Sequence, residues 1–270
     1  MTPQHIELVQ STVPVLRENG VALTSYFYQR MLNNHPELNN VFNLDSQSSG
    51  RQPRALAAAV LAYAEHIENP AVLAKAIEHI TTKHVSLNIQ AEQYAIVGEN
   101  LLHSISEVLN VAMESELIAA WKAAYLQLAE ILSAAEKQKY EQLAEKTGGW
   151  KGWRAFEITA IESTETGKIF TVRSTDSAVI SPAEEYAFVS VKVKVPNEAL
   201  EQPHQYTVIS STENSYQFAV KAEENPTKFA VSNILLTHYH ISDQVQLTAP
   251  MLKNAQVVAQ KPQQTERLSA

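Results

Sequence analysis

The first half of the chain carries apolar residues at helical spacing. Steps of three or four residues place side chains on one face of an α-helix. Two such stripes run through Tyr94, Val97, Leu101, Ile105 and Val108 and through Leu117, Trp121, Tyr125, Leu128 and Leu132. A capping residue followed by proline, which begins many helices, occurs at 2–3 and at 69–70. The pattern predicts about six or seven helices between residues 2 and 146.

The second half alternates apolar and polar residues with a period of two. This alternation runs through residues 189–195, 216–221 and 245–249. An apolar residue at every second position predicts a strand with one buried and one solvated face. Several short strands about a dozen residues apart predict a small antiparallel barrel or sandwich. The fold class is therefore an all-α domain followed by an antiparallel β domain.

Glycine marks the boundary between the halves. Three of the seven glycines, Gly148, Gly149 and Gly152, gather where the period changes. We expect one domain over residues 1–147, a second over 148–256 and a polar tail over 257–270. No glycine follows Gly167, so a glycine-rich loop that cradles phosphate is excluded from the last part of the chain.

Composition excludes several classes of function. A net charge of −8 without a Lys/Arg cluster disfavours nucleic acid as a partner. The absence of cysteine excludes disulfides, thiolate metal sites and cysteine nucleophiles. No apolar run approaches the length of a membrane span, and the first residues lack the pattern of a signal peptide. We expect a cytoplasmic protein that does not bind membranes.

One of the nine histidines stands out by its position. His84 follows a predicted helix over 71–83, where the helix gives way to a loop. Taken alone, it is interpreted as a surface histidine or one that interacts with the negative end of a helix. The residues that precede His84 change this interpretation. Tyr28 lies in an earlier predicted helix, and the segments 35–42 and 50–56 stand between Tyr28 and His84.

These segments, in this order, resemble the bacterial globins, and most closely the haemoglobin domain of flavohaemoglobins. The resemblance also includes residues 91–99, 120–125 and the junction at 148–150, and it covers residues 1 to about 150. It implies a globin fold that binds haem b. His84 matches the proximal histidine that binds haem iron, with Lys83 beside it. Phe42 matches the residue that stacks on the porphyrin, and Leu56 the apolar residue above the iron.

The resemblance also implies two polar pairs around the haem. Tyr28 and Gln52 match the distal pair, whose hydroxyl and amide donate hydrogen bonds to a bound ligand with partial negative charge. Tyr94 and Glu136 match the pair that hydrogen-bonds the far nitrogen of the proximal histidine and so raises its basicity. Singly, each of these residues has an ordinary interpretation: core packing for Tyr94 and Phe42, and an exposed helical position for Glu136.

This constellation implies nitric oxide dioxygenation within the family. The ligands are O₂ and NO, the product is nitrate, and each turnover consumes an electron. Tyr28, Gln52, Tyr94 and Glu136 are the residues expected to support the chemistry. An alternative from another class of function stays open: a haem-based gas sensor or oxygen carrier in which the β domain is a docking module.

Residues from about 153 to 254 resemble the flavin-binding barrel of the ferredoxin-reductase type. His204-Gln205-Tyr206-Thr207 stands where that family has Arg-x-Tyr-Ser. Tyr206 can still pack on the isoalloxazine of a flavin, and Thr207 can still donate a hydrogen bond. The arginine that pairs with the pyrophosphate is replaced by His204, and a neutral imidazole lacks its permanent charge and paired donors.

Two further flavin motifs are altered. Ala183-Glu184-Glu185-Tyr186 replaces Pro-Gly-Gln-Tyr, and the segment 229–232, ending in Ser232, replaces Gly-x-Val-Ser. Both glycines are gone and two carboxylates have arrived near a dianionic ligand, which argues against tight FAD binding. Tyr186, Tyr206 and Ser232 fit ordinary strand and loop structure as well as flavin contact. Because the sequence ends soon after 249–250, where the family continues into a nicotinamide domain, we expect no NAD(P)H site and an external reductase.

Overall fold

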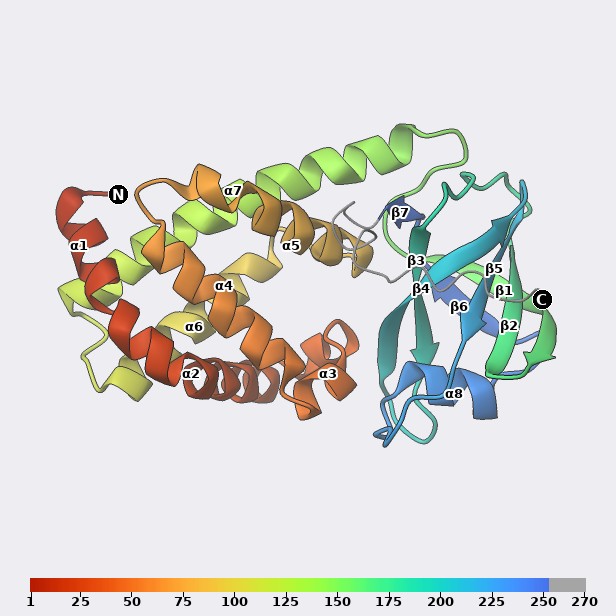
Figure 1. The fold of residues 1–270 in the computed structure, drawn as a ribbon, viewed down its shortest axis with the longest axis horizontal. Coiled ribbons are helices and arrows are strands. Elements are labelled where there is room, and N and C mark those ends of the chain that lie inside the picture. The colour runs from red at the N-terminus through yellow and green to blue at the C-terminus, as the bar shows by residue number, and fades with distance from the viewer. Residues whose placement is uncertain (253–270) are drawn as a thin grey trace, which may run out of the picture.

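The structure is a computed structural model, and residues 1–252 are described. The predicted tail over 257–270 and the end of the predicted second domain lie outside the described residues. A helical body and a β-barrel stand side by side, joined by a loop that follows one long helix (Figure 1). Among the described helices, none is both long and apolar enough to span a bilayer.

Seven α-helices occupy the described residues that precede the barrel. They are α1 (Pro3–Ser11), α2 (Val13–Asn34), α3 (Leu44–Ser48), α4 (Arg51–Glu65), α5 (Ala74–Ser86), α6 (Gln93–Leu109) and α7 (Glu116–Glu145), with the 3₁₀-helices η1 (Pro36–Asn40) and η2 (Pro70–Leu73) between them. Thr2 caps α1 as its sequence indicates, because its side chain accepts a hydrogen bond from the His5 N–H. η2 begins at Pro70, the second predicted start.

The helical stripes of the sequence form one core. α2 packs on α4 and α6, and α5 packs on α7. Leu101, Ile105 and Trp121 are buried in the same cluster as Phe27 and Tyr28. α6 and α7 approach closely at Gly98, where an added Cβ would lie only 2.4 Å from Cε1 of Tyr125. This close approach needs a residue without a side chain.

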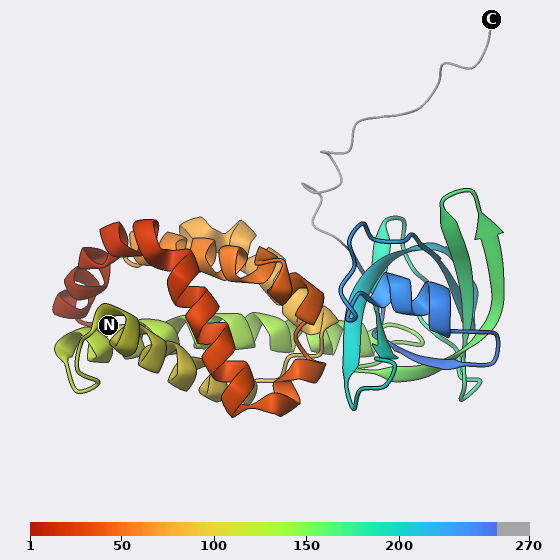
Figure 2. The same cartoon turned by 90° about the horizontal axis from the view of Figure 1, so that it is seen from below.

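The second body is an antiparallel barrel. Its strands are β1 (Arg154–Thr164), β2 (Gly167–Ser174), β3 (Ala187–Lys194), β4 (Glu201–Ser211), β5 (Ser215–Val220), β6 (Gln244–Leu247) and β7 (Met251–Leu252). The order β4-β5-β2-β1-β6-β3-β7, with a further β3–β4 pairing, closes the sheet. The helix α8 (Val231–His238), which the sequence pattern did not indicate, lies at one end of the barrel (Figure 2). The predicted fold class is confirmed.

The predicted alternation is confirmed in most strands but differs in β3. Tyr216, Phe218 and Val220 of β5 are buried and the residues between them are more open. In β3, however, Phe188 and Ser190 are buried on the face predicted to be wet. Phe188 packs with Val85 of α5 and Met251 of β7, so the helical body covers this face at Phe188, whereas the Ser190 N–H donates to the Thr248 hydroxyl within the barrel.

Hydrogen bonds join the two bodies beside η1 and α3. Gln202 of β4 is completely buried. Its amide nitrogen donates to the Asn39 carbonyl at 2.6 Å, and its amide oxygen accepts from the Leu44 N–H at 2.8 Å. Asn43 donates to the Pro203 carbonyl at 2.9 Å. These bonds hold β4 against the segment that leads into α4.

Candidate functional site

Three predicted residues meet where α5, α6 and α7 converge. His84 Nδ1 lies 2.7 Å from Oε1 of Glu136 and 3.1 Å from the Tyr94 hydroxyl oxygen. The Tyr94 hydroxyl donates to the same Glu136 oxygen at 2.6 Å. Glu136 is only 2 % exposed. The structure therefore brings together residues that are 52 positions apart in the chain.

The hydrogen bonds of this triad indicate which nitrogen of the His84 ring carries a proton. A buried carboxylate requires hydrogen-bond donors, and Tyr94 and the Nδ1–H of His84 supply them. Burial and the neighbouring Glu136 raise the pKa of Tyr94, so its hydroxyl keeps its proton and donates. With the proton assigned to Nδ1, Nε2 presents a lone pair that can bind a metal ion.

Two tyrosines support the triad from α7, and sequence reasoning did not identify either. Tyr125 donates to the Tyr94 carbonyl at 2.6 Å. Tyr140 donates to the Ile89 carbonyl at 2.7 Å, in the loop after His84. Burial raises the pKa of both hydroxyls. Tyr140 follows Glu136 by one helical turn. Residues at this spacing lie on the same face of a helix, so the sequence indicated that the two side chains are neighbours.

A second group of predicted residues gathers on α2 and α4. Tyr28 is 7 % exposed, and burial raises the pKa of its hydroxyl, an effect that the neighbouring Gln52 side chain partly offsets. The Phe42 ring meets the Tyr28 ring edge-on, with centroids 5.7 Å apart. Leu56 follows Gln52 by one turn of α4 and is partly buried in the helical core. The Tyr28 hydroxyl and the Gln52 amide are thus accompanied by the apolar side chains of Phe42 and Leu56.

The described residues fit a haem. Haem iron is commonly held by one neutral imidazole whose other nitrogen is hydrogen-bonded, and His84 with Glu136 has this form. The aromatic and aliphatic side chains of Phe42 and Leu56 are suited to a porphyrin, and Tyr28 and Gln52 are suited to a polar ligand.

The predicted flavin residues of β4 face different ways. The Tyr206 ring is 6 % exposed and stacks on Phe218 in the barrel core, with centroids 5.1 Å apart. Its hydroxyl lies 3.0 Å from Oγ of Ser232, which is itself buried. The His204 ring packs on Tyr206 at 4.9 Å, whereas Thr207 is exposed.

Gln205, between His204 and Tyr206, reaches the helical body. Its amide oxygen accepts from Nζ of Lys83 at 2.9 Å, and its amide nitrogen donates to Oγ of Ser86 at 2.6 Å. These two partners stand on either side of His84 in α5. The middle of the altered motif therefore contacts the predicted haem domain.

A shallow pocket lies between residues 183–186 and 207–211. Tyr186 is 53 % exposed there and adopts a φ of +64°, which is uncommon for a bulky residue. Glu184 and Glu185 line the same pocket as Thr207. Glu184 forms an exposed ion pair with Lys146 at 3.1 Å, so its charge is partly balanced and Glu185 is the other carboxylate of the pocket.

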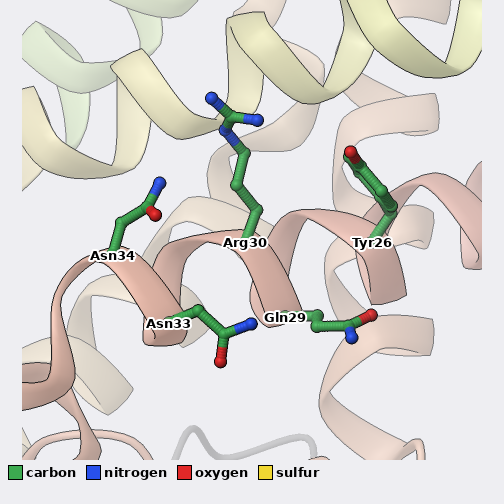
Figure 3. Close-up of a pocket in the computed structure, with 5 residues that line it drawn as sticks. All are labelled: Tyr26, Gln29, Arg30, Asn33 and Asn34. Carbon is green, nitrogen blue, oxygen red and sulfur yellow. The ribbon is translucent and has the colours of Figure 1, made fainter.

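Another polar pocket runs along α2, away from the residues discussed above (Figure 3). It is lined by Tyr26, Gln29, Arg30, Asn33 and Asn34. Arg30 and Tyr26 both bond to Glu107 of α6, each at 2.6 Å. Because its cation is already paired, this pocket offers no free charge to a ligand.

Comparison with known proteins agrees with both halves. The globin family model matches residues 25–132. The chain is 43 % identical over 254 residues to a flavohemoprotein of Bordetella pertussis, covering 93 % of this chain and 63 % of that protein. It therefore spans about 63 % of the length of this curated relative.

Two solved structures are also similar. A putative nitric oxide dioxygenase from Rhodothermus marinus, engineered as a carbene transferase, is 37 % identical with a TM-score of 0.51, covering 54 % of this chain and 99 % of that one. The flavohemoglobin of Malassezia yamatoensis, solved with bound FAD and heme, has a TM-score of 0.82 at 22 % identity, covering 94 % of this chain and 65 % of that one. The second likeness shows the fold alone.

Proposed function

Because this chain belongs to the flavohaemoglobin family and its helical half is a haem globin, we propose that it binds O₂ and converts NO to nitrate. Haem supplies a ferrous iron that binds and activates O₂. The chain's own residues hold the haem, orient the small ligands and exclude water. The activity is therefore proposed for the globin domain, with electrons delivered to it.

His84 is the residue that would hold the haem iron, through Nε2. Glu136, 2.7 Å from Nδ1, accepts the Nδ1 proton and makes the imidazole a stronger electron donor. Tyr94 donates to the same oxygen at 2.6 Å and fixes the carboxylate in place. Reversible oxygen storage does not require this arrangement, whereas chemistry on activated oxygen benefits from it.

Tyr28 and Gln52 are the proposed distal donors. Burial keeps the Tyr28 hydroxyl protonated, since it raises the pKa of that group. A protonated hydroxyl beside an amide offers donors to a ligand that carries partial negative charge. Phe42 and Leu56 keep the surroundings apolar, so that these hydrogen bonds are not weakened by water.

The observation that carries the proposal is the His84–Tyr94–Glu136 triad, because it joins a histidine to a fully buried carboxylate. The test mixes reduced, haem-loaded protein with O₂ and NO in a stopped-flow instrument and measures nitrate. We expect one nitrate for each NO consumed. Tyr28→Phe should slow the reaction by about tenfold or more, as expected for loss of a hydrogen bond made to developing charge.

Tyr26→Phe is the matched control for this experiment. Tyr26 lies on the same helix but bonds to Glu107 at 2.6 Å on the surface, and its loss should leave the rate unchanged. Nitrate formation no faster than in a haem solution without protein would contradict the dioxygenase proposal. It would leave the sensor or carrier function, which needs only ligand binding.

We also propose that electrons come from an external donor, since the barrel fits FAD poorly. Glu184 and Glu185 line the pocket beside Thr207. Lys146 partly balances the charge of Glu184, and Glu185 would repel a diphosphate. The Tyr206 ring is committed to the barrel core. Purified protein should release no flavin on denaturation and should not bind added FAD at micromolar concentration. One flavin released per chain would contradict this proposal and leave the dioxygenase proposal standing.

A further inference from the structure

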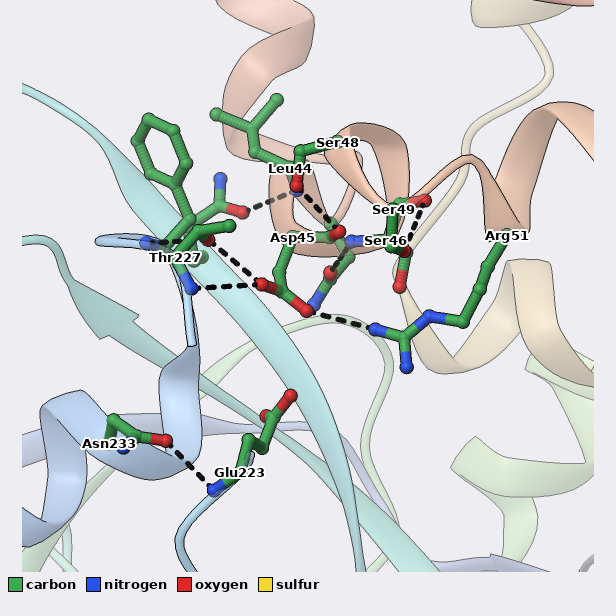
Figure 4. A network of polar contacts seen from close by, with 12 residues as sticks. Leu44, Asp45, Ser46, Ser48, Ser49, Arg51, Glu223, Thr227 and Asn233 are labelled. Atoms are coloured by element: carbon green, nitrogen blue, oxygen red, sulfur yellow. Dashed lines mark hydrogen bonds and ion pairs between the residues drawn. The ribbon is translucent and has the colours of Figure 1, made fainter. Parts of the chain in front are cut away.

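A buried carboxylate lies between the two bodies. Asp45 of α3 is 8 % exposed. Its Oδ1 accepts from the Thr227 hydroxyl at 2.8 Å and from the Thr227 N–H at 3.4 Å. Its Oδ2 accepts from Nη2 of Arg51 at 2.9 Å. Figure 4 shows Asp45 between Thr227, from the loop that precedes α8, and Arg51, at the start of α4.

Holding the barrel against the helical body does not by itself require a buried carboxylate at Asp45. A carboxylate taken from water loses hydration that only good donors replace. The nearby neutral amide of Gln202 already joins the same surfaces with two hydrogen bonds. The Arg51 side chain is 58 % exposed. Of the two partners of Asp45, Thr227 is therefore the more buried one. The arrangement links a barrel residue to one particular arginine.

That arginine opens the helix that carries the distal amide. Arg51 is the first residue of α4, and Gln52 is the second. The residue before them, Gly50, has a φ of +69° and gives no side-chain cap. Besides the bond from the Arg54 N–H to the Gly50 carbonyl, the first turn of α4 is held by two bonds to other helices: Arg51 to Asp45 at 2.9 Å, and the Pro53 carbonyl accepting from Thr24 at 2.8 Å.

We propose that Asp45 is a positioning residue for Gln52, which transmits the docking of the barrel, through Arg51 and the first turn of α4, to the distal side of the haem site. This inference rests on the proposed role of Gln52 as a distal donor. Thr227 orients Asp45, Asp45 fixes Arg51, and the first turn of α4 then presents the Gln52 amide toward Tyr28. The barrel thereby influences ligand binding at the distal side of the haem site.

The test uses the haem-loaded full chain and its CO adduct, whose C–O stretching frequency reports hydrogen bonding on the distal side. Asp45→Asn and Thr227→Val should both move the frequency toward that of Gln52→Leu. Each should also raise the O₂ dissociation rate by about fivefold, as expected for partial loss of one hydrogen bond. Thr227→Val keeps the charge of Asp45, and therefore still tests the link if Asp45→Asn is unstable.

The decisive comparison is made in the background of Gln52→Leu. If Asp45 acts through Gln52, Asp45→Asn has no further effect on the frequency or the O₂ dissociation rate in that background. Glu65→Gln is the control, because it breaks an ion pair with Arg17 at the other end of α4. It should leave the frequency and the dissociation rate unchanged.

Three outcomes would overturn the inference. One is an unchanged CO spectrum in both Asp45→Asn and Thr227→Val. Another is an effect of Asp45→Asn that persists in the Gln52→Leu protein. The third is an equal shift in Glu65→Gln. A wild-type protein that binds no haem gives no CO spectrum at all, and this result would refute the proposed function as well.

Discussion

At the scale of single residues, the state of His84 is set by atoms from two other helices. Glu136 reaches Nδ1 at 2.7 Å, and Tyr94 reaches the same carboxylate at 2.6 Å. Neither residue is remarkable in the sequence, where a lone glutamate late in a helix has an exposed position as its ordinary interpretation. The resemblance to globins singled them out, and the structure places them in contact.

Glu136→Gln tests the electron donation proposed for this contact. A neutral amide accepts the Nδ1 proton more weakly than a carboxylate, so the iron–histidine bond should weaken. We expect a lower iron–histidine stretching frequency in the resonance Raman spectrum of the ferrous, ligand-free protein. Glu141→Gln changes an exposed glutamate on the same helix and should leave the frequency unchanged. Equal frequencies in all three proteins would show that Glu136 does not tune the ligand.

Buried tyrosines predict a loss of stability at alkaline pH. Burial raises the pKa of Tyr63 and of Tyr216 from 10.0 to about 12. The unfolded chain releases these protons above pH 10 while the folded chain keeps them, so stability is full below pH 10 and falls as pH rises toward 12. The slope should be about 1.4 kcal/mol per pH unit for each tyrosine.

Urea denaturation at several pH values measures this slope, and tyrosinate absorbance follows the ionisation directly. Tyr63→Phe should make the slope shallower by the share of one tyrosine. A free energy of unfolding that stays constant from pH 10 to 12 would contradict the assignment of these hydroxyls as buried and protonated.

At the scale of elements, the helices were predictable because each buries a stripe that its own sequence displays. Leu101, Ile105 and Trp121 recur at helical spacing and lie in one core. β3 was less predictable, because Phe188 on its second face is covered by Val85 of the helical domain. Ser190 and Phe188 are buried on this face. The alternation of apolar and polar residues in a strand does not show that residues far away in the chain bury its polar face.

Gly98→Ala tests the close approach of α6 and α7. The new Cβ would lie 2.4 Å from the Tyr125 ring, so the helices must separate or the ring must move. We expect a loss of about 1–3 kcal/mol in the free energy of unfolding from this overpacking. Because Tyr125 donates to the Tyr94 carbonyl, the haem spectrum should also change.

Gly20→Ala is the matched control for that helix contact. Its new Cβ would meet Ala57 at an ordinary 3.5 Å, and alanine favours a helix interior over glycine by about 0.5–1 kcal/mol. We therefore expect opposite signs for the two variants in urea denaturation. Stabilisation by both would show that α6 and α7 are not packed as described.

At the scale of the whole molecule, domain docking had no signal in the sequence. Gln202 contacts Asn39 and Leu44 across more than 150 positions of the chain, and its residue type alone predicts an exposed site. The two-domain organisation was predictable, since the period of the apolar pattern changes from helical to strand spacing. Which residues meet depends on how the two surfaces fit, and a single sequence does not encode this visibly.

Gln202→Leu tests the docking. Leucine leaves the Leu44 N–H and the Asn39 carbonyl without their buried partner, at a cost of about 1–3 kcal/mol for each unsatisfied group. We expect a lower free energy of unfolding and faster amide hydrogen exchange over residues 39–46. Glu198→Gln removes an exposed ion pair with Lys228 on the barrel and should have little effect. Unchanged exchange in Gln202→Leu would contradict the described interface.

The proposed function depends on haem being held through His84. The pyridine haemochromogen spectrum measures the haem content of the purified protein. A resonance Raman spectrum of the ferrous protein then shows whether a histidine binds the iron. We expect one haem b per chain with an iron–histidine band. His84→Ala should lose this band, whereas His79→Ala, an exposed histidine of the same helix, should retain it. A wild-type protein without haem, or a band that survives in His84→Ala, would contradict the account.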